Sequence, residues 1–287
     1  MADTLLMGAV AYDPKVVTIW EGFRTWFAGR ELDFDFVLYS NYERQVQAHL
    51  EGHVHVAWNS PLAWLQAERA AKAAGRKAEA IAMRDTDCDL TSVIVVRSDS
   101  DVKSIADLKG RGRKVAVGAG DSPQATLIPL LHLAEHGVVP DDDVEVVKFD
   151  VLVGKHGDHI GGERDAVKAL LDAQVDAACM IDGNHLAFTA EGTIPAGATK
   201  ILAQTAPYDH CNFTIFDDVG PKAQVDRFRE LLLSMRYDDP AVRPLLDLEG
   251  LKVWKPGRTE GYAQLEKAID RFGTIEDFLA SLGGRCT

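Results

Sequence analysis

Short hydrophobic runs alternate with longer amphipathic stretches along the chain. Residues 5–11 (LLMGAVA), 34–39 (FDFVLY) and 54–58 (VHVAW) are typical of strands, and the segments between them have the spacing of helices. The same alternation recurs after Ser98, with strand patterns at 114–119 and 144–150. This order predicts an α/β protein whose mainly parallel sheets are flanked by helices.

An internal repeat suggests that this protein has two similar halves. Residues 46–58 (VQAHLEGHVHVAW) align without gaps on residues 167–179 (VKALLDAQVDAAC). Each copy reads as a helix, a tight turn and a short buried strand, so we expect two lobes built alike. The alternative is a chance likeness, because any helix-turn-strand unit has this pattern.

Two apolar runs predict how the chain is divided between the lobes. Residues 89–102 and 210–218 are typical of strands buried on both faces, and we expect both to cross between lobes. Lobe I would then be discontinuous, comprising residues 1–94 and 211–287, and lobe II would comprise residues 95–210. The segment from Gly220 onward is helical by pattern and is expected to pack on lobe I.

Composition narrows the partners and the compartment. The formal charge of −13, from 31 basic and 44 acidic residues, opposes binding to nucleic acid. No run approaches the roughly eighteen apolar residues of a transmembrane helix, so membrane insertion is not expected. The N-terminus lacks a basic segment, which predicts a cytoplasmic protein as written, or a periplasmic one if an export signal has been removed. Four cysteines without CxxC spacing predict neither a metal site nor a cofactor.

The stretch GAGDSPQ (residues 118–124) joins a strand pattern to a helix pattern. Gly118 and Gly120 would let a backbone approach closely, and Asp121 or Ser122 could cap the helix. Helix N-termini carry unpaired N–H groups and a positive dipole end, so such a loop suits an anionic or polar ligand group. The alternative is an ordinary cap with Pro123 in the first turn and no ligand.

These patterns resemble the phosphate, phosphite and phosphonate-binding group of type 2 periplasmic substrate-binding proteins, the receptors of ABC importers. The resemblance spans nearly the whole chain. It rests on Tyr12-Asp13-Pro14, on the paired units at 52–57 and 173–178, on VRSDSDVKSIADLKG (residues 96–110), and on the loop containing Ser122. It implies a two-lobed fold with two hinge strands, a small-molecule ligand and a permease partner.

Departures from the family pattern bear on the ligand. Pro123 and Gln124 stand where the family has hydroxyl residues, and Asp121 adds a negative charge, so we expect a group less highly charged than phosphonate. Arg164 stands where the family often has His and could hold a carboxylate or sulfonate with a bidentate fork. A solvated charge at a helix start is the alternative for Arg164.

Ligands of such sheets bind beyond the carboxyl ends of the strands, which selects the candidate residues. Tyr12 and Trp58 would wall the ligand, and Asn59 and Ser60 would supply neutral hydrogen bonds. The full predicted ligand-binding set is Tyr12, Trp58, Asn59, Ser60, Thr91, Ser92, Asp121, Ser122, Gln124, Arg164, Asp182, Asn184 and His210.

Residues beside the predicted crossings support a competing hypothesis. The same fold resembles cytoplasmic enzymes of the decarboxylase, lyase or cofactor-biosynthesis type, which act on small aromatic or heterocyclic acids. In that case Asp209, His210, Cys211 and Cys88 would be catalytic. Neighbours along a strand point to opposite faces, so we do not expect the His210 and Cys211 side chains to meet. A cytoplasmic ligand sensor without chemistry is a third hypothesis.

Overall fold

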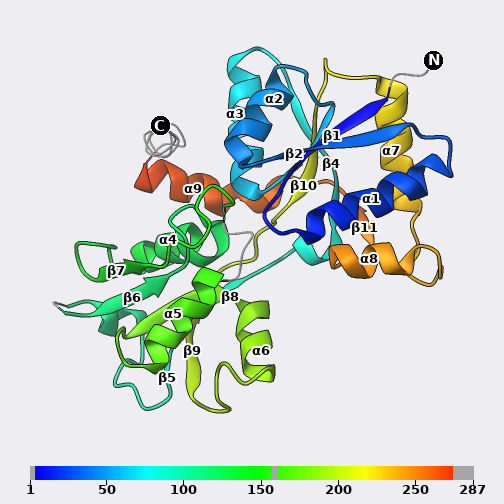
Figure 1. Ribbon diagram of the computed structural model, residues 1–287. Coiled ribbons are helices and arrows are strands. Elements are labelled where there is room, and N and C mark those ends of the chain that lie inside the picture. The colour runs from blue at the N-terminus through cyan, green and yellow to red at the C-terminus, as the bar shows by residue number, and fades with distance from the viewer. Residues whose placement is uncertain (1–3, 111, 157–160, 274–287) are drawn as a thin grey trace. The chain divides into compact units, whose positions relative to one another are not determined.

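The computed structural model describes residues 4–110, 112–156 and 161–273 (Figure 1). The chain forms two compact units. Unit 1 contains the residues up to Cys88 together with Asp209–Tyr262, and unit 2 contains Asp89–Tyr208 together with the residues from Ala263 onward. Each unit is an α/β structure with one sheet and its own core.

Unit 1 is built on a six-stranded sheet of order β11-β4-β10-β3-β1-β2. Strands β1, β2 and β3 are parallel, whereas β10 is antiparallel to β3 and β4, and β11 is antiparallel to β4. Its elements are β1 (Leu5–Val10), α1 (Lys15–Ala28), β2 (Phe34–Tyr39), α2 (Tyr42–Leu50), β3 (Val56–Asn59), α3 (Pro61–Ala73), β4 (Ala78–Arg84), η1 (Asp85–Asp87), β10 (Asn212–Phe216), α7 (Lys222–Ser234), α8 (Arg243–Glu249), β11 (Trp254–Pro256) and η4 (Glu260–Tyr262).

Unit 2 is built on a five-stranded sheet of order β7-β6-β8-β5-β9. Strands β6, β7 and β8 are parallel, and β5 is antiparallel to both β8 and β9. Its elements are β5 (Ser92–Arg97), η2 (Ile105–Leu108), β6 (Lys114–Val117), η3 (Pro123–Leu127), α4 (Ile128–Glu135), β7 (Glu145–Lys148), α5 (Gly161–Leu171), β8 (Ala177–Ile181), α6 (Asp182–Ala190), β9 (Thr199–Gln204) and α9 (Ala263–Phe272).

The two sheets share one strand order, because β2-β1-β3-β10-β4 in unit 1 corresponds to β7-β6-β8-β5-β9 in unit 2. The predicted α/β class with two halves built alike is confirmed. The sheets are mixed, but four strands of each run in the same direction, and only β10 and β11 in unit 1 and β5 in unit 2 run the opposite way. The prediction of mainly parallel sheets therefore holds for strand direction. Strands β5 and β10 follow directly after the chain has passed from one unit to the other, and each pairs antiparallel with both of its neighbours.

The repeat seen in the sequence occupies equivalent places in the two units. Its copies are the end of α2 with β3, and the end of α5 with β8. The turns also agree, since Gly52 has φ 78° and the aligned Ala173 has φ 58°. That region is open to glycine without strain, whereas an alanine there is strained by roughly 1–2 kcal/mol.

The chain passes between units earlier than predicted, at Cys88–Asp89 and Tyr208–Asp209. Strand β5 therefore lies wholly in unit 2 and β10 wholly in unit 1, so neither strand crosses. The last described helix, α9, belongs to unit 2, where it packs on α4 and η3 through its buried apolar face. The prediction that all of 211–287 joins lobe I is wrong for this helix, and residues 274–287 lie outside the described residues.

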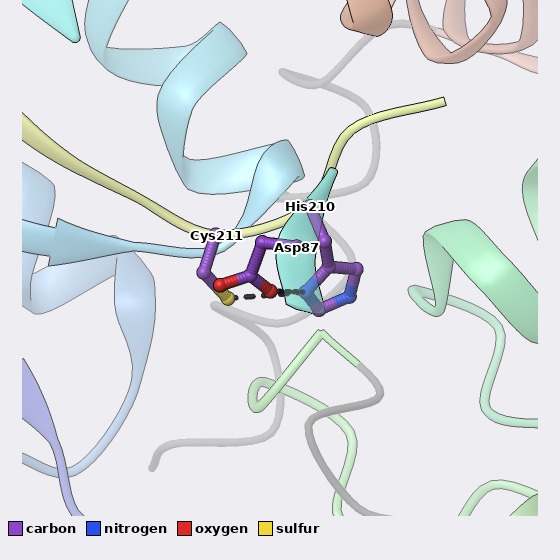
Figure 2. Close-up of side chains that lie close together, drawn as sticks. All are labelled: Asp87, His210 and Cys211. Carbon is purple, nitrogen blue, oxygen red and sulfur yellow. Dashed lines mark hydrogen bonds and ion pairs between the residues drawn. The ribbon is translucent and has the colours of Figure 1, made fainter. Parts of the chain in front are cut away.

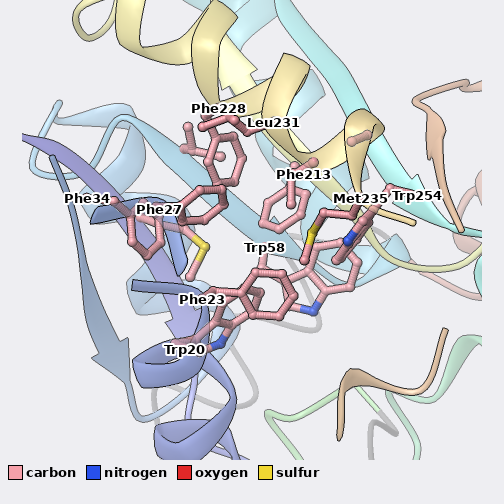
Figure 3. Close-up of a cluster of buried hydrophobic side chains, with 14 of the residues drawn as sticks. Trp20, Phe23, Phe27, Phe34, Trp58, Phe213, Phe228, Leu231, Met235 and Trp254 are labelled. Carbon is pink, nitrogen blue, oxygen red and sulfur yellow. The ribbon is translucent and has the colours of Figure 1, made fainter. Parts of the chain in front are cut away.

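The cores of the units differ in composition. Unit 1 has an aromatic core, in which Trp58 contacts the rings of Phe213 and Trp254 at centroid distances of 4.6 and 5.9 Å (Figure 3). Unit 2 has two largely aliphatic clusters, represented by Val95 and Leu170 in one and by Ile94 and Leu133 in the other. Because successive residues of a strand face opposite sides, β5 contributes to both clusters.

Candidate functional site

The loop between β6 and α4 folds back on itself. The Ser122 hydroxyl accepts a hydrogen bond from Ala125 N at 3.1 Å and caps the π-helical turn η3, which begins at Pro123. The Thr126 hydroxyl donates to Ala119 O at 2.7 Å. At Gly118 an added Cβ would lie 2.8 Å from the Ala125 Cβ, so close packing within the loop already requires this glycine.

Two carboxylates connect this loop to residues 150–156 through backbone N–H groups. Asp121 is fully buried and accepts hydrogen bonds from Gly154 N at 2.7 Å and His156 N at 3.2 Å. Burial raises the pKa of the Asp121 carboxyl, although the neighbouring His156 and these N–H groups oppose the rise. The Gly120 N–H donates to the Asp150 carboxylate at 2.8 Å. Within the described residues, the second Asp121 oxygen has no hydrogen-bond partner.

Five of the predicted residues come together at the ends of β5 and β8 in unit 2. The Thr91 hydroxyl donates to Asp182 Oδ2 at 2.7 Å and accepts from the Gln204 side chain at 2.7 Å. The Ser92 hydroxyl donates to the Gln124 carbonyl and lies 2.7 Å from the Tyr208 hydroxyl. These contacts tie the loop that carries Gln124 to the first residues of β5.

Asn184 and a carboxylate absent from the predicted set complete this group. Asn184 Nδ2 donates to Glu163 Oε2 at 2.8 Å, and the same oxygen accepts from Ile181 N at 3.1 Å. Glu163 is 2% exposed. It lies in the first turn of α5, directly before Arg164. Sequence reasoning selected only Arg164, because the family pattern drew attention to that position.

Arg164 does not join the group. Its guanidinium forms an ion pair with Glu191, donates to the Thr193 hydroxyl at 2.7 Å and lies 4.4 Å from the Phe188 ring centroid. These contacts within unit 2 hold the side chain between the start of α5 and the residues that follow α6. The alternative given for Arg164, a charge near the start of a helix, matches this placement.

The predicted residues of unit 1 are engaged inside that unit. Trp58 is 5% exposed and belongs to the aromatic core, so it walls no open surface there (Figure 3). Asn59 is fully buried and its amide bonds to Gln45 and to Thr214 at 2.8 and 2.9 Å. Ser60 caps α3 by accepting from Ala63 N at 3.2 Å. Tyr12 is half-buried against the same core.

A charged cluster lies where the chain enters and leaves unit 1. The Arg84 guanidinium binds both oxygens of Asp87, at 2.5 and 2.9 Å, and Glu249 at 3.2 Å. Burial raises the pKa of the Asp87 carboxyl, but Arg84 outweighs that effect and lowers the pKa to about 2. Asp209 forms a second pair with Arg258, at 2.7 and 2.6 Å.

His210 and Cys211 meet in this cluster, contrary to the sequence prediction. His210 Nδ1 lies 3.1 Å from Cys211 Sγ and 3.4 Å from Asp87 Oδ1 (Figure 2). The alternation of side chains fails here because both residues precede β10, which begins at Asn212. Neither Cys88 nor Cys211 forms a disulfide within the described residues, and burial raises the pKa of the Cys88 thiol.

Sequence reasoning missed Arg84, Glu249, Arg258 and Tyr262. The Tyr262 hydroxyl donates to His210 O at 2.8 Å and accepts from the Asn212 side chain at 2.8 Å. Arg84 could have been predicted, because it ends strand β4 and strand ends are where ligand-binding residues are expected. The other three come from segments distant in sequence, and their patterns show only helices and a short strand.

A scan against protein families decides the assignment. The family described as "ABC transporter, phosphonate, periplasmic substrate-binding protein" matches residues 9–265. The chain belongs to this family. Its members are periplasmic proteins that bind small ligands and work with a permease, which favours the receptor hypothesis over the enzyme hypothesis. No helix among the described residues is long and apolar enough to span a membrane.

Solved structures agree on the fold. PhnD1 from Prochlorococcus marinus in complex with methylphosphonate is 14% identical, with a TM-score of 0.69 over 93% of this chain and 97% of that one. XAC2383 from Xanthomonas citri bound to ATP is 16% identical, with a TM-score of 0.70 over 94% and 100%. The Escherichia coli aliphatic sulphonate binding protein SsuA is 17% identical, with a TM-score of 0.57 over 97% and 94%. No curated protein matches the sequence.

Proposed function

We propose that this protein is the receptor of an ABC importer for a small organic monoanion, a carboxylate or a sulfonate, which it prefers to a dianionic phosphonate. The ligand set we propose in unit 2 is Thr91, Ser92, Gln124, Asp182 and Asn184 together with the loop around Ser122. Arg164 is excluded because its charge is already paired with Glu191.

The observation that supports this preference is that backbone N–H groups of the loop already donate hydrogen bonds to acceptors within the protein. The Gly120 N–H donates to Asp150, and the Ala125 N–H donates to the Ser122 hydroxyl. Pro123 has no N–H to offer. A phosphonate dianion needs several such donors, whereas a group of lower charge needs fewer.

The negative charges around the loop also disfavour a dianionic ligand. The buried Asp121 carboxylate belongs to the loop, and an added Cβ at Gly118 would lie 3.9 Å from the side chain of Glu163. Asp182 adds a third carboxylate at the end of β8. Each negative group in a site of low dielectric raises the free energy of a bound anion, and a second charge on the ligand increases that repulsion.

Closure on the ligand would use the two segments that join the units. Leu90 and Tyr208 pair as an isolated antiparallel bridge, and His210 N donates to Asp87 O at 2.8 Å. Closure would require a change of φ and ψ within these two segments. Hinge motion of this kind is how binding proteins of this architecture enclose a ligand.

Titration calorimetry tests the proposal with ligand-free protein, acetate, methanesulfonate and methylphosphonate, at a pH where the phosphonate is a dianion. We expect the better monoanion to bind at least about tenfold more tightly than methylphosphonate, a difference of about 1.4 kcal/mol. Tighter binding of methylphosphonate than of either monoanion would contradict the proposed preference.

A pair of variants tests the ligand set. Thr91→Val removes the hydroxyl that contacts Asp182 and Gln204, and we expect it to weaken monoanion binding about tenfold. Thr189→Val is the matched control, because the Thr189 hydroxyl is exposed on α6 and bonds only to its own helix at His185 O. Equal affinities in the two variants would remove Thr91 from the site.

A further inference from the structure

Three side chains of different ligand chemistry converge in unit 1. The Asp87 carboxylate, the His210 ring and the Cys211 thiol each place one ligand atom within 4.8 Å of the others (Figure 2). All three residues are buried, with 2%, 8% and 2% of their surface exposed. Sequence reasoning paired His210 and Cys211 as catalytic candidates but did not add Asp87, which lies about 120 residues away in the chain.

The fold holds these side chains in place. His210 N donates to Asp87 O at 2.8 Å, which sets the two segments side by side. The Arg84 guanidinium orients the Asp87 carboxylate through two hydrogen bonds, and the Tyr262 hydroxyl fixes the His210 carbonyl. An ion would therefore meet donors that are already positioned.

Two of the three donor-to-donor distances are close to those around a tetrahedral metal ion, and the third lies within 4.8 Å. Zinc bonds of about 2.3 Å to sulfur and about 2.0–2.1 Å to nitrogen or oxygen separate neighbouring donors by about 3.3–3.6 Å. His210 Nδ1 lies 3.4 Å from Asp87 Oδ1 and 3.1 Å from Cys211 Sγ. Widening the nitrogen-to-sulfur distance by a few tenths of an ångström would admit the ion.

The charges also balance. Arg84 is shared between Asp87 and Glu249, so the guanidinium is offset by Glu249 when an ion takes up the Asp87 charge. Both oxygens of the Asp87 carboxylate accept hydrogen bonds from the Arg84 guanidinium, as an ionised carboxylate does. Cys211 would lose its thiol proton to solvent on binding. The carboxylate and the thiolate together then neutralise a divalent cation.

We propose that Asp87, His210 and Cys211 bind a thiophilic divalent cation of the zinc type, with the fourth coordination position open. One sulfur, one nitrogen and one oxygen ligand suit zinc or cobalt and do not suit magnesium or calcium, which prefer oxygen alone. All three residues lie within two positions of the points where the chain passes between units. Bound metal would tie these two segments together, which is a property separate from the binding of a small anion.

Cobalt is the probe for this site, because a thiolate ligand gives Co²⁺ an intense near-ultraviolet charge-transfer band. We expect the full chain, freed of metal with a chelator, to develop this band with one equivalent of Co²⁺ and to lose it when Zn²⁺ is added. Cys211→Ser should abolish the band, and His210→Gln should weaken Co²⁺ binding at least tenfold.

A third variant guards against failure of the first two to fold. Replacing Cys88, Cys179 and Cys286 together by Ser leaves Cys211 as the only thiol and keeps all three proposed ligands. The proposal requires the band to persist in this variant. No band in the wild-type protein, loss of the band in the triple variant, or a band that survives Cys211→Ser would overturn it. In the first case the short contact between His210 and Cys211 is a thiol–imidazole hydrogen bond only.

Discussion

The two sheets have the same strand order but different cores. The core of unit 1 contains tryptophan and phenylalanine rings beside a buried charged cluster, whereas the core of unit 2 is largely aliphatic. Arg84 joins the two features of unit 1, since its guanidinium lies 5.2 Å from the Trp58 ring centroid while binding Asp87. In unit 2, by contrast, β5 buries valine and isoleucine on both faces. The same strand order is therefore compatible with two kinds of core, one aromatic and one aliphatic.

A single aligned position shows this difference most clearly. His49 in α2 corresponds to Leu170 in α5, and both are fully buried. His49 lies against the Phe216 ring at a centroid distance of 4.2 Å, and burial lowers its pKa to about 3. Unit 1 thus carries an acid-sensitive group at a place where unit 2 carries a hydrocarbon.

The largest effect on the free energy of unfolding is expected from removing the Arg84 guanidinium of the buried charged cluster. Arg84→Met leaves the carboxylates of Asp87 and Glu249, 2% and 3% exposed, without their partner. Breaking a buried ion pair in this way costs about 3–5 kcal/mol of unfolding free energy. Urea unfolding followed by amide exchange should show the loss in β10 of unit 1 and not in β8 of unit 2.

The control for this variant is Arg24→Met in α1. Arg24 pairs with Glu21 and Asp35, but all three side chains are more than 40% exposed. Surface pairs of this kind contribute about 0–1 kcal/mol. If the two variants lose similar amounts of stability, the Arg84 cluster does not stabilise unit 1 in the way described.

A smaller, pH-dependent effect on the free energy of unfolding is expected from replacing His49 by leucine, the residue that unit 2 has at the aligned position. In the wild type, unfolding lets His49 take up a proton once the pH is below its ordinary pKa of 6.5, while the folded form resists until about pH 3. Stability is therefore lost as the pH falls through this window, by about 2 kcal/mol at pH 5. His49→Leu should remove this loss while changing stability little at pH 7.

The measurement is the free energy of unfolding of both proteins at pH 7 and pH 5, followed in unit 1. His53→Leu serves as the control, because His53 is exposed and should leave the pH dependence as it is in the wild type. An identical fall between pH 7 and pH 5 in His49→Leu and the wild type would show that His49 does not titrate as burial predicts.

The α/β class, the repeat and the loop before α4 could be predicted from the sequence, because they follow from local periodicity and from glycine and proline placement. The points of passage between units could not, since β5 and β10 are apolar runs whose pattern does not say which sheet they join. The helix α9 was misassigned for the same reason. Its apolar face, with Leu265 and Ile269, fits either unit by pattern.

Side-chain roles were harder to predict than elements. Trp58 and Asn59 follow the rule that residues at strand ends bind ligands, yet their partners Phe213 and Thr214 come from β10, more than 150 positions away in the sequence. Thr91 and Asp182 were selected by the same rule, and their side chains contact each other because β5 and β8 are neighbours. The outcome depends on which strands pair, and that information is not local.

The most direct test of the ligand preference is the pH dependence of methylphosphonate binding by the wild-type protein. Calorimetric titrations should span the pH at which the phosphonate gains its second charge, with methanesulfonate, whose charge is constant, correcting for titration of the protein itself. We expect the corrected dissociation constant to rise at least about tenfold as the dianion forms. A constant that falls over the same range would show a site built for the dianion and would contradict the proposal.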